Sequence, residues 1–80
     1  MILEIKIPVI DKEVDEYHIV FWYKETGDVV KKDEILVEIA TDQDAYTIPA
    51  EENGVLEIIA EEGSYVKAND VLYNIKLEDK

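Results

Sequence analysis

The chain of 80 residues is long enough for one small domain, and it carries 20 acidic residues against 8 lysines and no cysteine. A formal charge of −12 repels phosphate backbones and anionic lipid headgroups, which argues against nucleic-acid and membrane partners. The absence of cysteine excludes a disulfide framework, a thiolate metal site and a cysteine nucleophile. No secretory signal or membrane-spanning apolar run is present, so we expect a cytoplasmic protein, or a mitochondrial-matrix protein in a eukaryote. The acidic excess favours basic protein partners or simply keeps a small domain soluble, and composition leaves both interpretations open.

The first segment, residues 2–7 (ILEIKI), alternates apolar and polar side chains and is typical of a half-buried strand. Residues 9–17 (VIDKEVDEY) then form the longest irregular stretch, in which Val14 is placed to turn back into the core. We expect this loop to display four acidic residues: Asp11, Glu13, Asp15 and Glu16.

An aromatic run, Phe21-Trp22-Tyr23, follows this loop. Strand alternation places Phe21 and Tyr23 on one face and Trp22 on the other. We expect one face to be core, and the other is either core as well, the commoner use of such residues, or an exposed interaction patch. His18, just before the run, is the only histidine. A general base needs an orienting partner and a metal site needs several ligands, so we interpret His18 as an ordinary strand or surface residue.

Residues 40–45 (ATDQDA) form a short polar stretch between two apolar segments. The Asp-x-Asp spacing of Asp42 and Asp44 lacks the glycine and distal glutamate of a calcium loop, so we interpret both as turn-forming residues. Ser64 is the only serine and has no paired histidine motif. The sequence therefore predicts no catalytic residue and no metal site.

The strongest internal signal is a repeat between residues 19–39 and 55–75 at a constant offset of 36, with no gap. Identical residues include the pairs Glu25/Glu61, Gly27/Gly63, Val30/Val66, Lys31/Lys67, Leu36/Leu72 and Ile39/Ile75. We therefore expect one domain over residues 1–80, built from half-repeats of about 1–40 and 41–77. Each half is too small to fold alone, so the two should pack face to face.

Turn signals punctuate both halves, at Gly27, Gly54 and Gly63 and at the polar clusters 31–34 and 67–70. Valine, isoleucine and tyrosine are frequent, and no window keeps a helical stripe. We predict an all-β fold of about eight short strands, arranged as a flattened barrel or sandwich of two four-stranded sheets with a quasi-twofold internal repeat.

The order and spacing of these features resemble the lipoyl domains of 2-oxo acid dehydrogenase complexes, which belong to the dihydrolipoamide acyltransferase component. Biotinyl carrier domains share that hammerhead-like fold. The resemblance covers nearly the whole chain and rests on Ile7-Pro8, Ile19-Val20-x-Trp22, Gly27-Asp28-x-Val30, Leu36-x-Glu38-Ile39, Thr41-Asp42, Ile48-Pro49-Ala50, Gly54-Val55, Glu62-Gly63-x-x-Val66 and Val71-Leu72.

In that family a lysine follows Thr-Asp at the tip of a hairpin and carries lipoate through an amide bond as a swinging arm. The resemblance places Gln43 at this position, with Asp42 and Asp44 beside it. A carboxamide nitrogen is neither basic nor a useful nucleophile, and no lysine lies between Lys32 and Lys67. We therefore expect no cofactor in the chain as written, and lipoate only if residue 43 were a lysine.

Ala40 and Asp44 depart from the family pattern as well, which favours natural divergence over an engineered replacement at Gln43, although both explanations stay open. By resemblance, the loop carrying Asp11, Glu13, Asp15 and Glu16 helps protein partners, namely a lipoate ligase and the dehydrogenase-complex components, to recognise the domain.

The sequence is compatible with three functions. The first is a non-enzymatic lipoyl-type domain of an acyltransferase that cannot be lipoylated. The second is a stand-alone acidic interaction module that has kept the fold without a cofactor. The third, a small hydrolase using Asp42 and Asp44, lacks any recognisable pocket motif.

Overall fold

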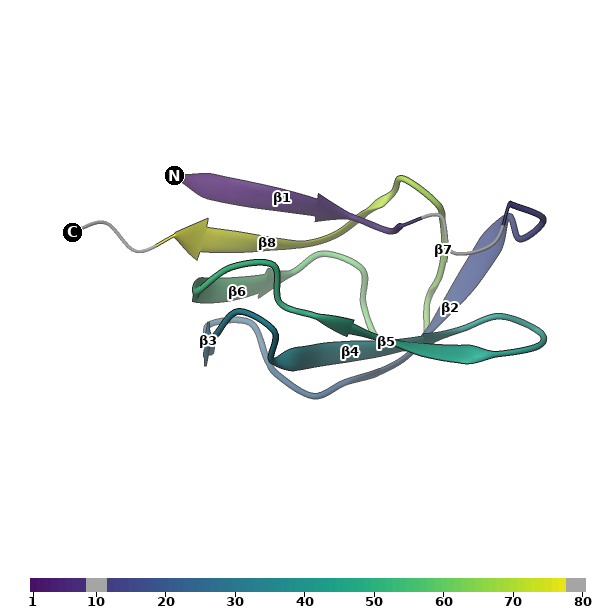
Figure 1. Cartoon of the computed structure of the whole chain (residues 1–80), viewed down its shortest axis with the longest axis horizontal. Helices are drawn as coiled ribbons and strands as arrows, with labels where there is room; N and C mark the ends of the chain where they lie inside the picture. Colours follow the sequence, from purple (N-terminus) through teal and green to yellow (C-terminus); the bar gives the residue numbers. More distant parts are fainter. Residues whose placement is uncertain (9–11, 78–80) are drawn as a thin grey trace.

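A computed structural model describes residues 1–8 and 12–77, and these residues form eight strands and no helix (Figure 1). All strand pairs are antiparallel, and the sheet orders are β1-β8-β6-β3 and β5-β4-β2-β7. This confirms the predicted all-β fold of two four-stranded sheets. The strands are β1 (Ile2–Lys6), β2 (Glu16–Trp22), β3 (Val29–Val30), β4 (Ile35–Ala40), β5 (Ala45–Pro49), β6 (Gly54–Ile58), β7 (Tyr65–Lys67) and β8 (Val71–Leu77).

The core fills the space between the two sheets and is made of apolar and aromatic side chains. Strand alternation turns one side of each long strand inward, and burial of these side chains supplies the main stabilisation of so small a domain. Among the described residues, the largest fully buried side chains are those of Tyr17, Tyr73, Ile7, Ile19, Leu36, Ile39, Leu56, Leu72 and Ile75.

The two half-repeats interleave. β2 and β4 of the first half lie in one sheet with β5 and β7 of the second, whereas β6 and β8 lie in the other sheet with β1 and β3. We expected the two halves to pack face to face, and this is wrong: the two sheets face each other, and each sheet contains two strands of either half. Neither half can close its own sheet, because its outer strands pair with the opposite half.

The first half-repeat contains one extra residue, in β2, that the constant offset of 36 does not show. Ile39 and Ile75 are equivalent at the offset of 36, but Ile39 pairs with Ile19 and Ile75 pairs with Leu56. Leu56, not Val55, is therefore the counterpart of Ile19, one position beyond that offset. The register of β2 against β4 shifts between Ile19 and Phe21, which makes Val20 a β-bulge.

The bulge changes which side chains of β2 point inward. Tyr17 and Ile19 are buried before it, and Trp22 is buried after it at 8% exposure. Phe21 and Tyr23 face outward at 48% and 49% exposure. The predicted division of the aromatic run into a core face and an exposed face is therefore confirmed, with Trp22 on the core side.

Gly54 has a different role from the one predicted. It was expected in a turn, but it is the first residue of β6 and is buried. A Cβ atom there would collide with the carbonyl oxygen of Lys76 and with Cγ2 of Ile75 on the neighbouring strand β8. Glycine is needed at this position because β6 and β8 approach closely, not because a turn requires its backbone freedom.

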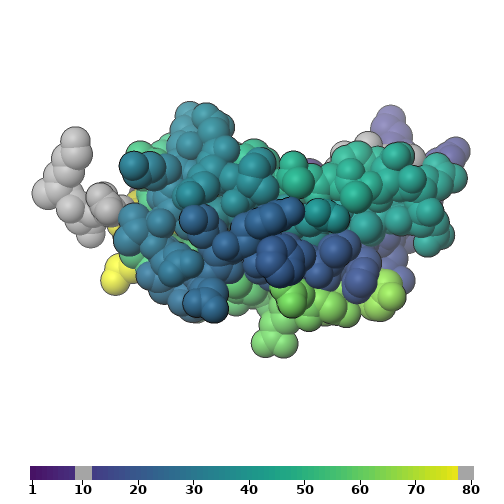
Figure 2. Space-filling view, turned by 90° about the horizontal axis from the view of Figure 1, so that it is seen from below, coloured from purple at the N-terminus to yellow at the C-terminus, as the bar shows by residue number. Residues whose placement is uncertain are grey.

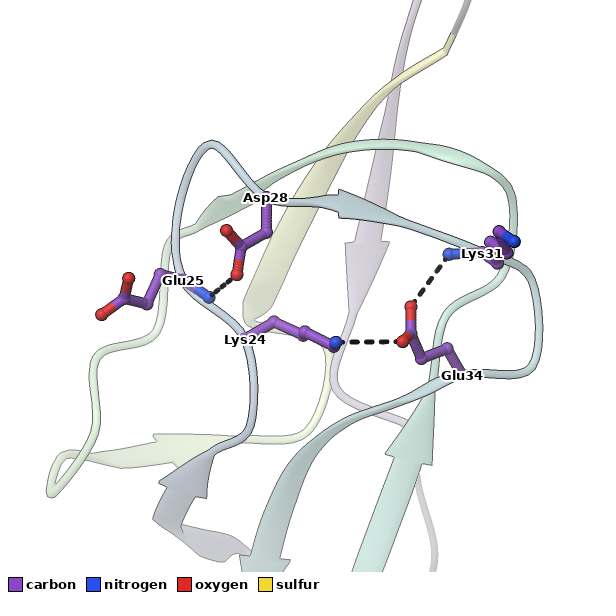
Figure 3. A network of polar contacts seen from close by, with 5 residues as sticks. All are labelled: Lys24, Glu25, Asp28, Lys31 and Glu34. Carbon is purple, nitrogen blue, oxygen red and sulfur yellow. Dashed lines mark hydrogen bonds and ion pairs between the residues drawn. The ribbon is translucent and has the colours of Figure 1, made fainter.

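Side-chain caps hold the turns around β3. The Glu34 carboxylate pairs with Lys24 Nζ at 3.0 Å and accepts the Lys31 N–H at 3.1 Å, and the Asp28 carboxylate accepts the Glu25 N–H at 2.8 Å (Figure 3). The Lys24 contact, followed by the bond from Lys31, lowers the pKa of Glu34. Lys24 is thereby occupied by a local partner.

The molecule is elongated, with extents of 42 × 19 × 19 Å. The β4–β5 hairpin forms one end of the long axis, while the start of β1 and the end of β8 lie at the other (Figure 1). At that second end the Leu77 N–H donates to the Met1 carbonyl oxygen at 2.9 Å. The hairpin tip is therefore far from both described ends of the chain.

Candidate functional site

The tip of the β4–β5 hairpin is organised by the side chain of Thr41. Beyond the last pair of the ladder, Ala40 and Ala45, the Thr41 N–H donates to the Asp44 carbonyl oxygen at 2.8 Å. The Thr41 hydroxyl oxygen accepts the N–H groups of Gln43 at 3.3 Å and of Asp44 at 3.2 Å. These local bonds fix the backbone of the turn and leave the Gln43 side chain exposed.

Asp42 and Asp44 lie in the turn, as predicted, but the side-chain cap of the turn is Thr41 and not either carboxylate. Among residues 1–8 and 12–77, no hydrogen bond is found for either carboxylate, and both side chains are exposed. Threonine and aspartate both cap turns, and here Thr41 does so. The two aspartates instead place negative charge on either side of Gln43.

A surface hollow of about 530 Å³ lies beside the tip. His18 of β2 and Tyr65 of β7 stack in it, with ring centroids 4.7 Å apart and planes inclined by 21°. His18 is thus a half-buried strand residue that pairs with Ala40, next to the turn of the hairpin. The rest of the lining consists of Glu13, Val14, Asp15, Glu16, Ala40, Thr41, Asp42 and Gln43.

The structure brings most of the predicted recognition residues to this hollow. Glu13, Asp15 and Glu16 are exposed and line it together with Gln43, while Asp11 lies outside the described residues. Val14 is half-buried and packs against the core. The irregular stretch was drawn too long, because Glu16 already belongs to β2 and pairs with Lys67.

Tyr65 was missed as a site residue, because only the pairing of β7 with β2 carries it to His18. Thr41 was missed as the capping residue, although its place directly before Asp42 was a usable signal.

In the described residues, the candidate metal-binding side chains are not grouped and the Ser64 hydroxyl is engaged locally. Within the described part of the chain, no three His, Cys, Asp or Glu side chains are grouped to hold a metal ion. The Ser64 hydroxyl donates to the Glu61 carbonyl oxygen inside its own turn. The described residues also include no helix long and apolar enough to cross a membrane. What remains is an exposed, rigid tip beside an acidic surface.

An interleaved β-sandwich with a capped hairpin at one end is the architecture of a small carrier-type domain, and comparison with known proteins identifies the family. The model of the biotin/lipoyl family, described as "Biotin-requiring enzyme", matches residues 3–75, and the chain belongs to this family. The predicted resemblance is confirmed.

Relatives of the chain are components of two dehydrogenase complexes. It is 41% identical over 73 residues to the dihydrolipoyllysine-residue succinyltransferase component of the 2-oxoglutarate dehydrogenase complex of Pseudomonas aeruginosa, covering 90% of this chain and 18% of that protein. It is 31% identical over 80 residues to the dihydrolipoyllysine-residue acetyltransferase component of the pyruvate dehydrogenase complex of Staphylococcus aureus, covering 99% and 19%. The chain thus spans about a fifth of the length of these relatives.

A solved structure gives the same result. The lipoyl domain of the 2-oxoglutarate dehydrogenase complex from Azotobacter vinelandii superposes with a TM-score of 0.80 at 31% identity, covering 96% of this chain and 99% of that one. The chain is therefore a lipoyl-type domain in both sequence and fold.

Proposed function

We propose that the chain is the lipoyl-type domain of a 2-oxo acid dehydrogenase acyltransferase in a form that presents its hairpin without a lipoyl arm. The observation that carries the proposal is the exposure of Gln43 at the tip, directly after Thr41 and Asp42, where the resemblance places the family's lysine. In this role the domain is a recognised scaffold and does no catalysis of its own.

The residues at the tip do not fit lipoate. Its attachment as an amide needs an amine, and Gln43 offers only a carboxamide nitrogen, whose lone pair is delocalised. The nearest lysines in sequence, Lys32 and Lys67, are outside the hairpin. Residue 43 therefore offers no attachment point for an acyl-carrying arm.

The acidic hollow beside the tip supports a role in docking. Glu13, Asp15, Glu16 and Asp42 line it together with the stacked rings of His18 and Tyr65. A surface with this charge attracts basic surfaces of partner proteins and speeds their encounter. Docking on the hollow is equally expected of a stand-alone interaction module. The experiment that distinguishes this module from a lipoyl-type domain of an acyltransferase must therefore test modification at residue 43.

The test is to restore the amine. The variant Gln43→Lys, incubated with a lipoate ligase, lipoate and ATP, should gain the mass of one lipoyl group, whereas the unaltered chain should gain none. Asp44→Lys is the matched control, because it moves the amine by one residue along the same turn. It should stay unmodified if the ligase recognises the position of the amine within the turn. Intact-mass spectrometry followed by peptide mapping gives the readout.

Two results would reject the proposal. One is lipoylation of the unaltered chain. The other is a Gln43→Lys variant that stays unmodified while a lipoyl domain of known competence is modified in the same tube. The second result would favour the interaction module, since the tip would no longer have the shape that a ligase recognises.

A further inference from the structure

We propose that a second surface, on the side of the domain and apart from the hairpin tip, docks an arginine-bearing basic segment of a partner protein. This aromatic hollow has a volume of about 860 Å³. Its wall and floor come from Phe21, Trp22, Tyr23, Ile58, Glu61 and Glu62. None of these residues lines the hollow at the tip, and the inference does not depend on whether residue 43 can be modified.

The exposed aromatic rings are the first indication of a docking surface. Phe21 and Tyr23 are each about half exposed, and their rings meet edge to face with centroids 5.0 Å apart. Val20 and Ile59 add further exposed apolar surface nearby in the chain. Exposed apolar side chains that gather in one place, with a polar rim, mark interaction sites on small proteins.

The floor of the hollow is built rigidly. Trp22 is buried at 8% exposure, its Nε1–H donates to the Ala60 carbonyl oxygen at 2.8 Å, and its ring meets Tyr73 edge to face at 6.2 Å. The Trp22 N–H also donates to the Glu62 carboxylate at 3.1 Å. Trp22 of the floor and Glu62 of the rim are therefore bonded to each other before a partner binds, which reduces the entropic cost of binding.

The charge of the rim selects the partner. Glu25, Glu61 and Glu62 surround the aromatic rings, and the single lysine of the hollow, Lys24, is engaged by Glu34 at 3.0 Å. Figure 2 shows this face, with the blue atoms of β2 and the following residues beside the green atoms of the segment after β6. An anionic or purely apolar partner would meet uncompensated carboxylates here.

An arginine side chain satisfies both features at once. Its planar guanidinium stacks on aromatic rings and binds carboxylates in a bidentate manner, and its aliphatic stem covers apolar surface. A lysine would make the charge contact without the stacking. The geometry thus points to a basic segment with arginine at its centre.

Trp22 is the only tryptophan, so its fluorescence reports directly on this hollow. Titration with the capped peptide Ala-Arg-Ala-Arg-Ala-Arg-Ala should change that fluorescence saturably and shift backbone amide signals in segments 20–28 and 58–63. Substituting lysine for arginine in the peptide should weaken binding by roughly threefold, because an ammonium keeps the charge but loses the planar stacking and the bidentate carboxylate contact. Added salt should weaken both peptides.

Matched variants separate the two features. Phe21→Ala and Glu61→Gln should each raise the dissociation constant by roughly three- to fivefold. Val29→Ala and Glu4→Gln, an exposed apolar and an exposed acidic residue outside the hollow, should leave it unchanged. An absence of saturation, amide shifts spread evenly over the acidic surface or centred on the hairpin hollow, or unchanged affinity in Phe21→Ala and Glu61→Gln would each overturn the proposal.

Discussion

Ile19 and Leu56 are equivalent residues of the two sheets: the carbonyl oxygen of each accepts a hydrogen bond from a glycine in the opposite half. The bonds run from the Gly63 N–H to Ile19 at 2.7 Å and from the Gly27 N–H to Leu56 at 2.8 Å. Both glycines have positive φ, 86° and 99°. The interleaved halves are thus joined by two matching turns, each of which needs a backbone that glycine adopts most easily.

This equivalence predicts equal costs. Gly27→Ala and Gly63→Ala should each lower the free energy of unfolding by about 1 kcal/mol, because the strain comes from the backbone and a Cβ atom would meet nothing within 4 Å at either site. Urea unfolding followed by circular dichroism measures both. A difference of about 1 kcal/mol between the two variants would show that the two turns do not bear the same strain.

Gly54→Ala should be much more damaging. Its Cβ atom would overlap the backbone of Lys76 and the side chain of Ile75, so β6 and β8 would have to separate. We expect a loss of roughly 3 kcal/mol or more, at the upper end of the range for overpacked sites. Unfolding midpoints of the three glycine variants, measured together, check the order, and a Gly54→Ala chain as stable as Gly27→Ala would contradict the close approach of the strands.

Thr41→Ala should loosen the hairpin tip. Without the hydroxyl, the N–H groups of Gln43 and Asp44 lose their acceptor, and stability should fall by about 1 kcal/mol. Amide exchange at these two positions should speed up, while exchange in β6 and β8 should follow only the global change. Thr41→Ser keeps the hydroxyl and should preserve slow exchange at the tip. Equal exchange in the alanine and serine variants would remove Thr41 from its capping role.

Tyr73 should make the domain sensitive to alkali. Its side chain is fully buried, and this burial raises its pKa to about 12 from the usual 10.0, although the Glu51 N–H partly offsets the shift. Between these values the unfolded chain loses the phenolic proton and the folded chain keeps it. Stability should therefore be intact below pH 10 and fall by up to about 2–3 kcal/mol as the pH rises to 12.

Unfolding curves at several pH values and the tyrosinate absorbance of the folded protein measure this effect. Tyr73→Phe should remove the tyrosinate absorbance increase that occurs at the highest pH, and it should reduce the loss of unfolding free energy between pH 10 and 12. Tyr65→Phe, at an exposed position, should change neither quantity. A late absorbance step that persists in Tyr73→Phe would assign it to another tyrosine.

The sequence predicted the sheets well because strand alternation and glycine turns are local signals. It could not place the bulge at Val20. Because Val20 and Phe21 are both apolar, the alternation of apolar and polar residues is satisfied whichever of the two side chains points into the core. The role of Gly54 depends on how closely β8 passes, which no local pattern records.

The same limit applies to the two surfaces. Gln43 and the acidic loop were found because a family pattern points to them, and their functional roles stay predictions. An exposed face of the aromatic run was one of the alternatives that the sequence left open. The hollow itself was missed, since Trp22 and Glu62 are 40 positions apart and only the folded chain joins them.

The contact between Leu77 and Met1 has the same form as the contact between Thr41 and Asp44. Thr41 follows β4 and donates its N–H to the carbonyl oxygen of the residue just before β5. Leu77 ends β8 and donates its N–H to the carbonyl oxygen of the residue just before β1. Met1 and Leu77 thus occupy the place in one sheet that the hairpin turn occupies in the other. A circularly permuted chain, opened between Asp42 and Gln43 and joined by a short linker across the original ends, would keep every strand pair. Its new ends would emerge at the opposite pole, where any fused cargo would crowd the acidic hollow instead of leaving it clear.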